Sequence, residues 1–151
     1  MALYLVQHGQ ALSKEHDPER GLSEEGRAET ERIAQVAAQY RVHVSRIEHS
    51  GKTRARQTAE ILAAHLSPAE GPDPREGIAP LDDVTAVAAQ LDPTSDLMLV
   101  GHLPFLERLV GVLIAKVPEL RVFKMQGGGI LCLDRDDRGW HIKWALMPRV
   151  G

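Results

Sequence analysis

Apolar residues follow two different periods along the first two thirds of the chain. The wholly apolar runs at residues 2–6 and 97–100 are typical of strands buried on both faces of a sheet, and a weaker strand is predicted over 44–48. Polar residues over 10–22, and four prolines and two glycines over 67–80, predict loops. Apolar residues three or four positions apart predict four helices. Three of them cover residues 23–40, about 54–66 and 104 to about 114. The remaining helix is capped by Asp82 or Asp83 and ends at Asp92-Pro93.

The last third of the chain changes to strand patterns in succession. Strand-like segments occur at residues 122–125, 129–133 and 140–147, and we expect a hairpin turn over 134–139. Strands that first alternate with helices and then follow one another predict an α/β fold, specifically a three-layer α/β/α sandwich with a mixed, mostly parallel sheet. The length of 151 residues fits one domain over residues 1–151.

Composition narrows the class of protein and of partner. Hydrophobic residues make up 43% and charged residues 26%, which is ordinary for a soluble globular protein. The formal net charge is −3 and the positive residues are scattered, so we expect no nucleic-acid partner. No apolar run reaches 18 residues and no secretory leader is recognisable, so we expect a cytoplasmic protein without a membrane partner. Cys132 lies in an apolar run and is expected to be a buried structural thiol.

Both strong apolar runs end in a histidine beside a glycine. His8 precedes Gly9 after the first run, and His102 follows Gly101 after the second. Ligands of open α/β sheets bind beyond the carboxyl ends of the strands, where helix N-termini offer backbone N–H groups to anions. A bound phosphate dianion also favours the protonated form of a neighbouring imidazole. The pattern therefore indicates phosphate chemistry at this edge of the sheet.

Four separated segments carry short motifs. They are Leu5-Val6-Gln7-His8-Gly9, Gly21-Leu22-Ser23-Glu24-Glu25-Gly26-Arg27, Ser50-Gly51-Lys52-Thr53-Arg54-Ala55-Arg56-Gln57-Thr58-Ala59 and Val100-Gly101-His102-Leu103-Pro104. In this order they resemble the Arg-His-Gly motif, the Pro-Leu-Thr-x-x-Gly segment, the Ser-Pro-x-x-Arg-Ala-x-Gln-Thr helix start and the second histidine site of the histidine phosphatase superfamily. Within this superfamily, the chain resembles the short SixA-type phosphohistidine phosphatases. The resemblance implies a phosphoglycerate-mutase-like fold and phosphatase activity.

The same resemblance implies roles for individual residues. His8, as a neutral imidazole, would attack phosphorus and give a phosphohistidine that water then hydrolyses. Arg54 and His102 would stabilise charge on the transferred group, which needs no metal or other cofactor because positioning and electrostatics supply most of this catalysis. The residues expected to line the phosphate pocket are Gln7, Gly9, Ser50 and Gly101. The sequence has no paired-carboxylate or His-x-x-x-His pattern of metal ligands.

Gln7 departs from the family pattern, which has arginine before the nucleophile. Loss of a charge-assisted hydrogen bond costs about 1.5 to 3 kcal/mol, or roughly ten- to over a hundredfold in rate if it acts only on the transition state. The sequence therefore leaves open a low-activity or non-catalytic domain that binds phosphate or phosphoproteins. It also leaves open a broad small-molecule phosphomonoesterase. Lys52 and Arg56 are weak candidates for compensating cations, because Arg56 should face away from Arg54.

The general acid has two candidates, Asp82 and Asp83, although helix capping explains one of them. SixA-type enzymes also lack an obvious acid, which suits phosphohistidine, because protonated imidazole leaves phosphorus without much help. We therefore expect the substrate to be a phosphorylated protein, such as a histidine-containing phosphotransfer domain in signal transduction, or a small phosphorylated molecule. Arg20 and Arg27 are expected to be solvated, and the alternative is that either one borders the site. The remaining histidines are expected to be surface or structural residues: His16, His43, His49, His65 and His141.

Overall fold

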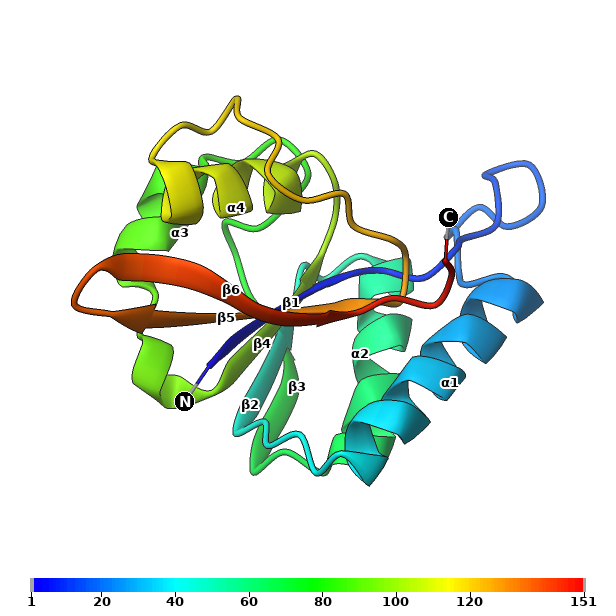
Figure 1. Cartoon of the computed structure of the whole chain (residues 1–151). Helices are drawn as coiled ribbons and strands as arrows, with labels where there is room; N and C mark the ends of the chain where they lie inside the picture. The colour runs from blue at the N-terminus through cyan, green and yellow to red at the C-terminus, as the bar shows by residue number, and fades with distance from the viewer. Residues whose placement is uncertain (1, 151) are drawn as a thin grey trace.

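A mixed sheet of six strands runs through the middle of the protein, with helices on both of its faces (Figure 1). The computed structural model describes residues 2–150. The strands are β1 (Leu3–Gln7), β2 (Arg46–His49), β3 (Glu70–Pro74), β4 (Leu97–Gly101), β5 (Ile130–Asp136) and β6 (Gly139–Leu146). The helices are α1 (Glu24–Gln39), α2 (Thr53–Leu66), α3 (Val84–Gln90) and α4 (Phe105–Ala115), with one 3-10 turn at Pro93–Ser95.

The order of strands across the sheet is β3-β2-β4-β1-β5-β6. Strands β3, β2, β4 and β1 are parallel, whereas β5 pairs antiparallel with β1 and β6 pairs antiparallel with β5. The predicted fold class is therefore confirmed. In the parallel register Gln7 pairs with Gly101, so the residues that follow β1 and β4 emerge side by side at one edge of the sheet.

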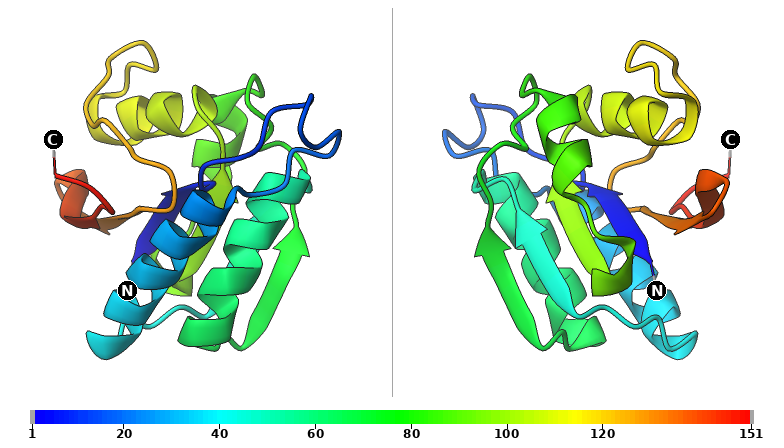
Figure 2. Two further views of the ribbon diagram at one scale, coloured as in Figure 1. Left: turned by 90° about the vertical axis from the view of Figure 1, so that its right-hand side faces the viewer. Right: turned by 90° about the vertical axis from the view of Figure 1, so that its left-hand side faces the viewer.

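The two helical layers bury opposite faces of the same strands. Tyr4 and Val6 of β1 cluster with apolar residues of α1 and α2, whereas Leu3 and Leu5 cluster with those of α3 and α4. Figure 2 shows the two layers on either side of the sheet. Burial on both faces explains why β1 and β4 read as continuous apolar runs. Cys132 lies in the core as expected, with a thiol pKa raised to about 11 by burial.

Helix α1 begins where its cap predicts. The Ser23 hydroxyl accepts a hydrogen bond from the Gly26 N–H at 3.0 Å, and Glu24 and Glu25 occupy the first turn. Asp83 caps α3 in the same way by accepting from the Thr85 N–H. No helix of the described chain has both the length and the apolarity needed to cross a bilayer.

Three predictions about local structure are wrong. Residues 70–74 form the edge strand β3 rather than part of a loop, and an edge strand tolerates proline because its outer N–H groups need no partner. No strand forms over 122–125, where Met125 and Phe123 instead pack on the core from a loop that links α4 to β5. The hairpin turn is shorter than 134–139, because β5 continues to Asp136 and β6 already begins at Gly139.

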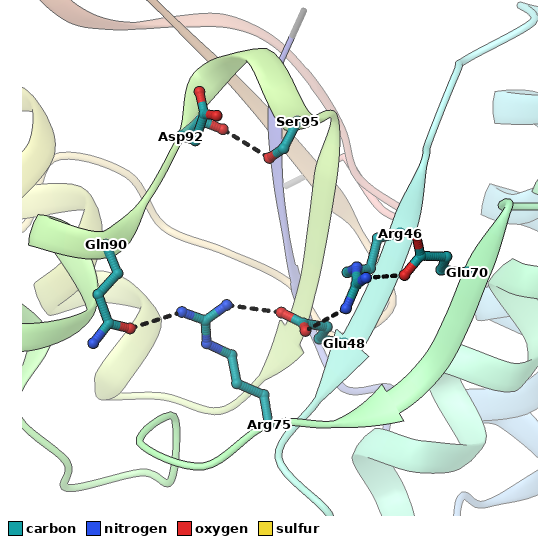
Figure 3. Close-up of polar contacts among 7 residues, drawn as sticks. All are labelled: Arg46, Glu48, Glu70, Arg75, Gln90, Asp92 and Ser95. Atoms are coloured by element: carbon teal, nitrogen blue, oxygen red, sulfur yellow. Dashed lines mark hydrogen bonds and ion pairs between the residues drawn. The ribbon is translucent and has the colours of Figure 1, made fainter.

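A polar network ties the edge of the sheet to α3 (Figure 3). The guanidinium of Arg75, just after β3, donates to Glu48 of β2 at 2.7 Å and to Gln90 of α3 at 3.0 Å. Arg46 of β2 forms ion pairs with Glu48 and with Glu70 of β3. The backbone N–H of Arg75 also donates to the carbonyl of His49 at 2.7 Å. The network therefore fixes the end of β2, from which Ser50 extends.

Candidate active site

The ends of β1 and β4 bring two histidines together. The backbone N–H of His8 continues the parallel ladder by donating to the Gly101 carbonyl at 2.9 Å. The imidazole rings of His8 and His102 lie with their centroids 5.0 Å apart and their planes inclined by 55°. The juxtaposition follows directly from the pairing of the two apolar strands.

The His8 ring is held in one tautomer. Its Nδ1 lies 2.7 Å from the carbonyl oxygen of Gly9. Because a carbonyl only accepts, Nδ1 carries the proton and Nε2 keeps its lone pair. Burial lowers the pKa of His8, and the charges of Arg54 and Arg20 lower it further against the opposing effect of the Gly9 hydrogen bond. The imidazole is therefore neutral near pH 7, with a free nitrogen suited to nucleophilic attack.

His102 is almost completely buried, with 2% of its surface exposed. Its Nε2 lies 2.6 Å from the hydroxyl oxygen of Ser50, and its Nδ1 is buried without a hydrogen-bond partner among the described residues. Burial, then the charges of His8 and Arg54, lower the pKa of His102 to about 3. A bound anion would reverse this balance, because it favours the protonated ring.

Arg54 extends from the first turn of α2, and its Nε is buried without a partner among residues 2–150. Burial lowers the Arg54 pKa, and the charge of Arg20 adds to the effect. The first turn of α2 contains no acidic residue, and Lys52 at the cap position makes no side-chain cap bond. A guanidinium at the positive end of a helix dipole is locally unfavourable. An anion held between Arg54 and the two histidines would offset this cost.

Thr58 links the nucleophile loop to the arginine helix. Its hydroxyl accepts a hydrogen bond from the Gly9 N–H at 3.0 Å and donates to the Arg54 carbonyl at 2.8 Å. Thr58 lies within the helix motif over residues 50–59, but that motif by itself indicates no contact with the nucleophile loop. Position 9 has no room for a side chain, because a Cβ there would stand 2.8 Å from the Thr30 hydroxyl and 3.1 Å from the Gly26 carbonyl.

Gln7 has a partly buried side chain at the end of β1. Its Oε1 is buried without a hydrogen-bond partner in the described chain, while its backbone carbonyl accepts from the Gly128 N–H at 2.8 Å. Gln7, Gly127 and Arg149 line a cavity of about 200 Å³ together with His8. The three-glycine segment 127–129 therefore packs against the nucleophile strand, and Gly128 adopts φ +82° there.

Arg20 lies nearer the site than its sequence position suggests. It is partly buried, its Nε donates to the Leu12 carbonyl at 3.3 Å, and its charge lowers the pKa values of His8, His102 and Arg54. Side chains from other segments order its loop. Asp17 accepts from the Gly21 N–H at 2.8 Å, and Gln57 of α2 accepts from the Leu22 N–H at 2.7 Å.

The two aspartates proposed as general acids have structural partners. Asp82 accepts from the Ala79 N–H at 2.8 Å, and Asp83 caps α3. Both line a cavity with Glu76 and Gln90, and His8 is not among its lining residues. Within residues 2–150, no three His, Cys, Asp or Glu side chains converge as a group that would hold a metal ion.

Two other polar residues near the site turn to different partners. Arg56 forms an ion pair with Glu60 at 3.1 Å on the exposed face of α2. His49 is buried, and its Nδ1 accepts a hydrogen bond from the Gly51 N–H at 3.0 Å. His49 therefore shapes the turn that carries Ser50.

Comparison with known proteins identifies the family. Residues 3–82 match the sequence model of the histidine phosphatase superfamily (branch 1). The chain belongs to the histidine phosphatase superfamily. It is also 40% identical over 115 residues to an uncharacterized protein of Picosynechococcus sp. (strain ATCC 27264 / PCC 7002 / PR-6), a match that covers 69% of this chain and 67% of that relative.

Solved structures agree with this assignment. A putative phosphohistidine phosphatase SixA from Agrobacterium tumefaciens is 26% identical, with a TM-score of 0.77 over 97% of each chain. The protein histidine phosphatase SixA complexed with tungstate shares the fold at 24% identity, with a TM-score of 0.81 over 98% of this chain and 97% of that one. Superfamily membership and the SixA-like fold support phosphatase activity for this histidine phosphatase.

Proposed function

We propose that this histidine phosphatase hydrolyses phosphohistidine in proteins through a phosphohistidine intermediate on its own His8. One observation carries the proposal: the neutral His8 ring, with Nε2 left for attack, lies with its centroid 5.0 Å from that of His102, and two buried atoms, Arg54 Nε and His102 Nδ1, have no partner within residues 2–150. Buried polar atoms are seldom left without a partner. A tetrahedral dianion placed among these groups would satisfy both and bring phosphorus to the nucleophile.

The reaction proceeds in two displacements. His8 Nε2 donates its lone pair to phosphorus, and the P–N bond of the substrate breaks. The departing imidazole takes the electrons of that bond, keeps the proton on its other ring nitrogen, and so leaves as a neutral molecule. Water then attacks phosphorus, the bond to Nε2 breaks, and His8 regains its lone pair, while both protons of the water leave with the inorganic phosphate as H2PO4⁻. Arg54 stabilises the charge on the phosphoryl oxygens in both steps. His102 donates a hydrogen bond once the bound dianion has raised the pKa of its ring and the ring has taken a proton from solvent.

The substrate class follows from the leaving group. Asp82 and Asp83 have structural partners in a cavity apart from His8, so they offer an alkoxide leaving group no acid. Glu29, the carboxylate among the lining residues of the His8 cavity, is ion-paired with Arg149 at 3.6 Å. Imidazole leaves as a neutral molecule when the phosphohistidine is protonated, and it needs no such acid. The likeness to proteins named SixA points the same way. The substrate is a phosphorylated protein, such as a histidine-containing phosphotransfer domain of a cytoplasmic signalling relay.

Turnover of phosphohistidine in the presence of a chelator tests the proposal. The wild-type protein should release phosphate from a phosphohistidine protein faster than from a panel of phosphoesters. His8→Ala should abolish this release, whereas His141→Ala, which alters an exposed histidine of β6, should not. Equal turnover by His8→Ala would overturn the mechanism, and faster turnover of phosphoesters would favour a broad phosphomonoesterase.

A further inference from the structure

A second, larger cavity adjoins the one that His8 lines. It has a volume of about 610 Å³, and its lining residues include Gln7, Lys124, Gln126 and Arg149. It shares Gln7, Gly127 and Arg149 with the cavity of about 200 Å³ that contains His8. The two cavities therefore form one depression that extends from the nucleophile past Gln7 toward the C-terminal residues.

The larger cavity is positively charged. Lys124 and Arg149 are among its lining residues and no carboxylate is, although the protein as a whole has a net charge of −3. The smaller cavity beside it is lined by one carboxylate, Glu29. Lys124 has no ion-pair partner among the described residues. Arg149 meets Glu29 only through Nε at 3.6 Å, and 62% of its side chain remains exposed. Two cations are therefore available to a ligand beside the site.

The position of Arg149 is fixed by a reciprocal clamp. The Arg149 N–H donates to Gln126 Oε1 at 2.9 Å, and Gln126 Nε2 donates to the Arg149 carbonyl at 3.0 Å. Arg32 of α1 also donates to the Pro148 carbonyl at 2.6 Å. Seen along the sheet, the loop before β5 and the C-terminal segment pass on one side of the end of β1, and the loop over 10–22 passes on the other (Figure 2, left). The clamp thus holds a backbone that presents Arg149 along one flank of the site.

We propose that Lys124 and Arg149 form a recognition surface for an acidic segment of the phosphorylated protein, next to its phosphohistidine. The inference rests on the proposed function and adds a substrate preference to it. Carboxylates of the substrate would pair with the two cations while the phosphoryl group reaches His8. Gln7 lines both cavities and is neutral, so it does not compete with Lys124 and Arg149 for the carboxylates of the substrate. Charges at the rim of an interface determine specificity and rates of association more than total affinity.

Selectivity between two peptides tests this surface. One peptide carries phosphohistidine flanked by glutamates and the other carries phosphohistidine flanked by lysines. The wild type should have the lower KM for the acidic peptide. In Lys124→Glu/Arg149→Glu, the ratio of the two KM values should change by roughly tenfold or more in favour of the basic peptide, given the modest strength of each exposed charge pair. Each ratio is measured within one variant, so a general loss of activity cancels.

A matched control separates local recognition from overall charge. Arg138→Glu/Lys143→Glu makes the same change in net charge, at the hairpin turn before β6 and on β6 itself, outside the cavity. It should leave the KM ratio at the wild-type value. An equal change in both double variants, or no change in Lys124→Glu/Arg149→Glu, would overturn the inference.

Measurements of peptide affinity test the recognition surface without requiring phosphohistidine turnover. Fluorescence anisotropy with the same peptides, each carrying a non-hydrolysable phosphohistidine analogue, should rank the wild type and both double variants in the same order as the KM ratios. Absence of phosphohistidine turnover by the wild type, with charge-dependent binding retained, would refute the proposed activity and leave the recognition surface supported. Turnover with no difference in affinity between the peptides would refute the surface alone.

Discussion

Replacing Thr58 with valine should affect both stability and catalysis through one lost hydroxyl. Thr58 is fully buried, and valine has nearly the same shape. The substitution leaves the Gly9 N–H without its acceptor at 3.0 Å. A buried donor left unsatisfied costs about 1 to 3 kcal/mol. For a protein of this size, each 1 kcal/mol lowers the Tm by roughly 2 to 4 °C.

The catalytic effect follows from the same contact. The His8 ring is held by the Gly9 carbonyl, and the Gly9 peptide is held by Thr58. Loosening that peptide lets His8 Nε2 drift from the line of attack, and a misplacement of 1 Å costs on the order of a hundredfold in rate. We expect kcat to fall at least about tenfold, with a smaller change in KM.

Thr30→Val provides the control for this prediction. Thr30 is also fully buried, but its hydroxyl donates only to the Gly26 carbonyl of its own helix. Urea denaturation and phosphohistidine turnover should be measured for both variants. If Thr58→Val loses no more stability or kcat than Thr30→Val, then Thr58 does not position the nucleophile loop.

Three further predictions concern the groups around His8. The unfolded chain takes up a proton on each histidine near pH 6.5, whereas burial holds the pKa of His8 lower and that of His102 at about 3 in the folded protein. The unfolded state therefore binds more protons below pH 6.5, so the free energy of unfolding, measured with urea, should fall as the pH drops from 6.5 toward 3. His102→Asn should make this fall shallower. An unchanged slope in His102→Asn would contradict a lowered pKa for His102. Ser50→Ala removes the partner 2.6 Å from His102 Nε2 and should lower kcat several-fold, since a neutral hydrogen bond contributes about 0.5 to 1.5 kcal/mol; kcat within twofold of wild type would contradict a role in orienting the ring. Gln7→Arg restores a charge beside the nucleophile and should raise kcat/KM by about tenfold or more, whereas no change alongside a fully active wild type would rule out the idea that Gln7 weakens catalysis.

The strand ends could be predicted from the sequence because a strand buried on both faces has a continuous run of apolar residues. Each of the runs 2–6 and 97–100 is continuous and apolar, and each stops at a histidine. Parallel pairing of such strands brings their carboxyl ends to one edge of the sheet. The structure accordingly places His8 beside His102, with ring centroids 5.0 Å apart.

Contacts between residues far apart in the chain could not be predicted from the sequence pattern. The bond from Gly9 to Thr58 joins residues 49 positions apart, and the Gln126–Arg149 clamp depends on a loop with no regular period. Arg20 lies close enough to lower the pKa values of the site residues, in a loop that Asp17 and Gln57 order by hydrogen bonds. Hydrophobic spacing describes which face of an element is buried and does not describe where a polar loop folds back.

The errors in secondary structure have a related cause. Phe123 and Met125 alternate as in a strand because both pack on the core, yet no neighbouring strand pairs with them. The prolines of 70–74 predict a loop, but pairing with β2 along one edge is enough to make β3. In both segments the tertiary contact, rather than the local pattern, determines the outcome.

The proposed mechanism requires His8 to carry the phosphoryl group during turnover. Rapid mixing of the protein with a ³²P-labelled phosphohistidine substrate, an alkaline quench and peptide mapping tests it directly. The mechanism predicts a transient label that is stable in alkali, labile in acid and located on His8 Nε2. A label on another residue, or undiminished turnover with no label on His8, would contradict it.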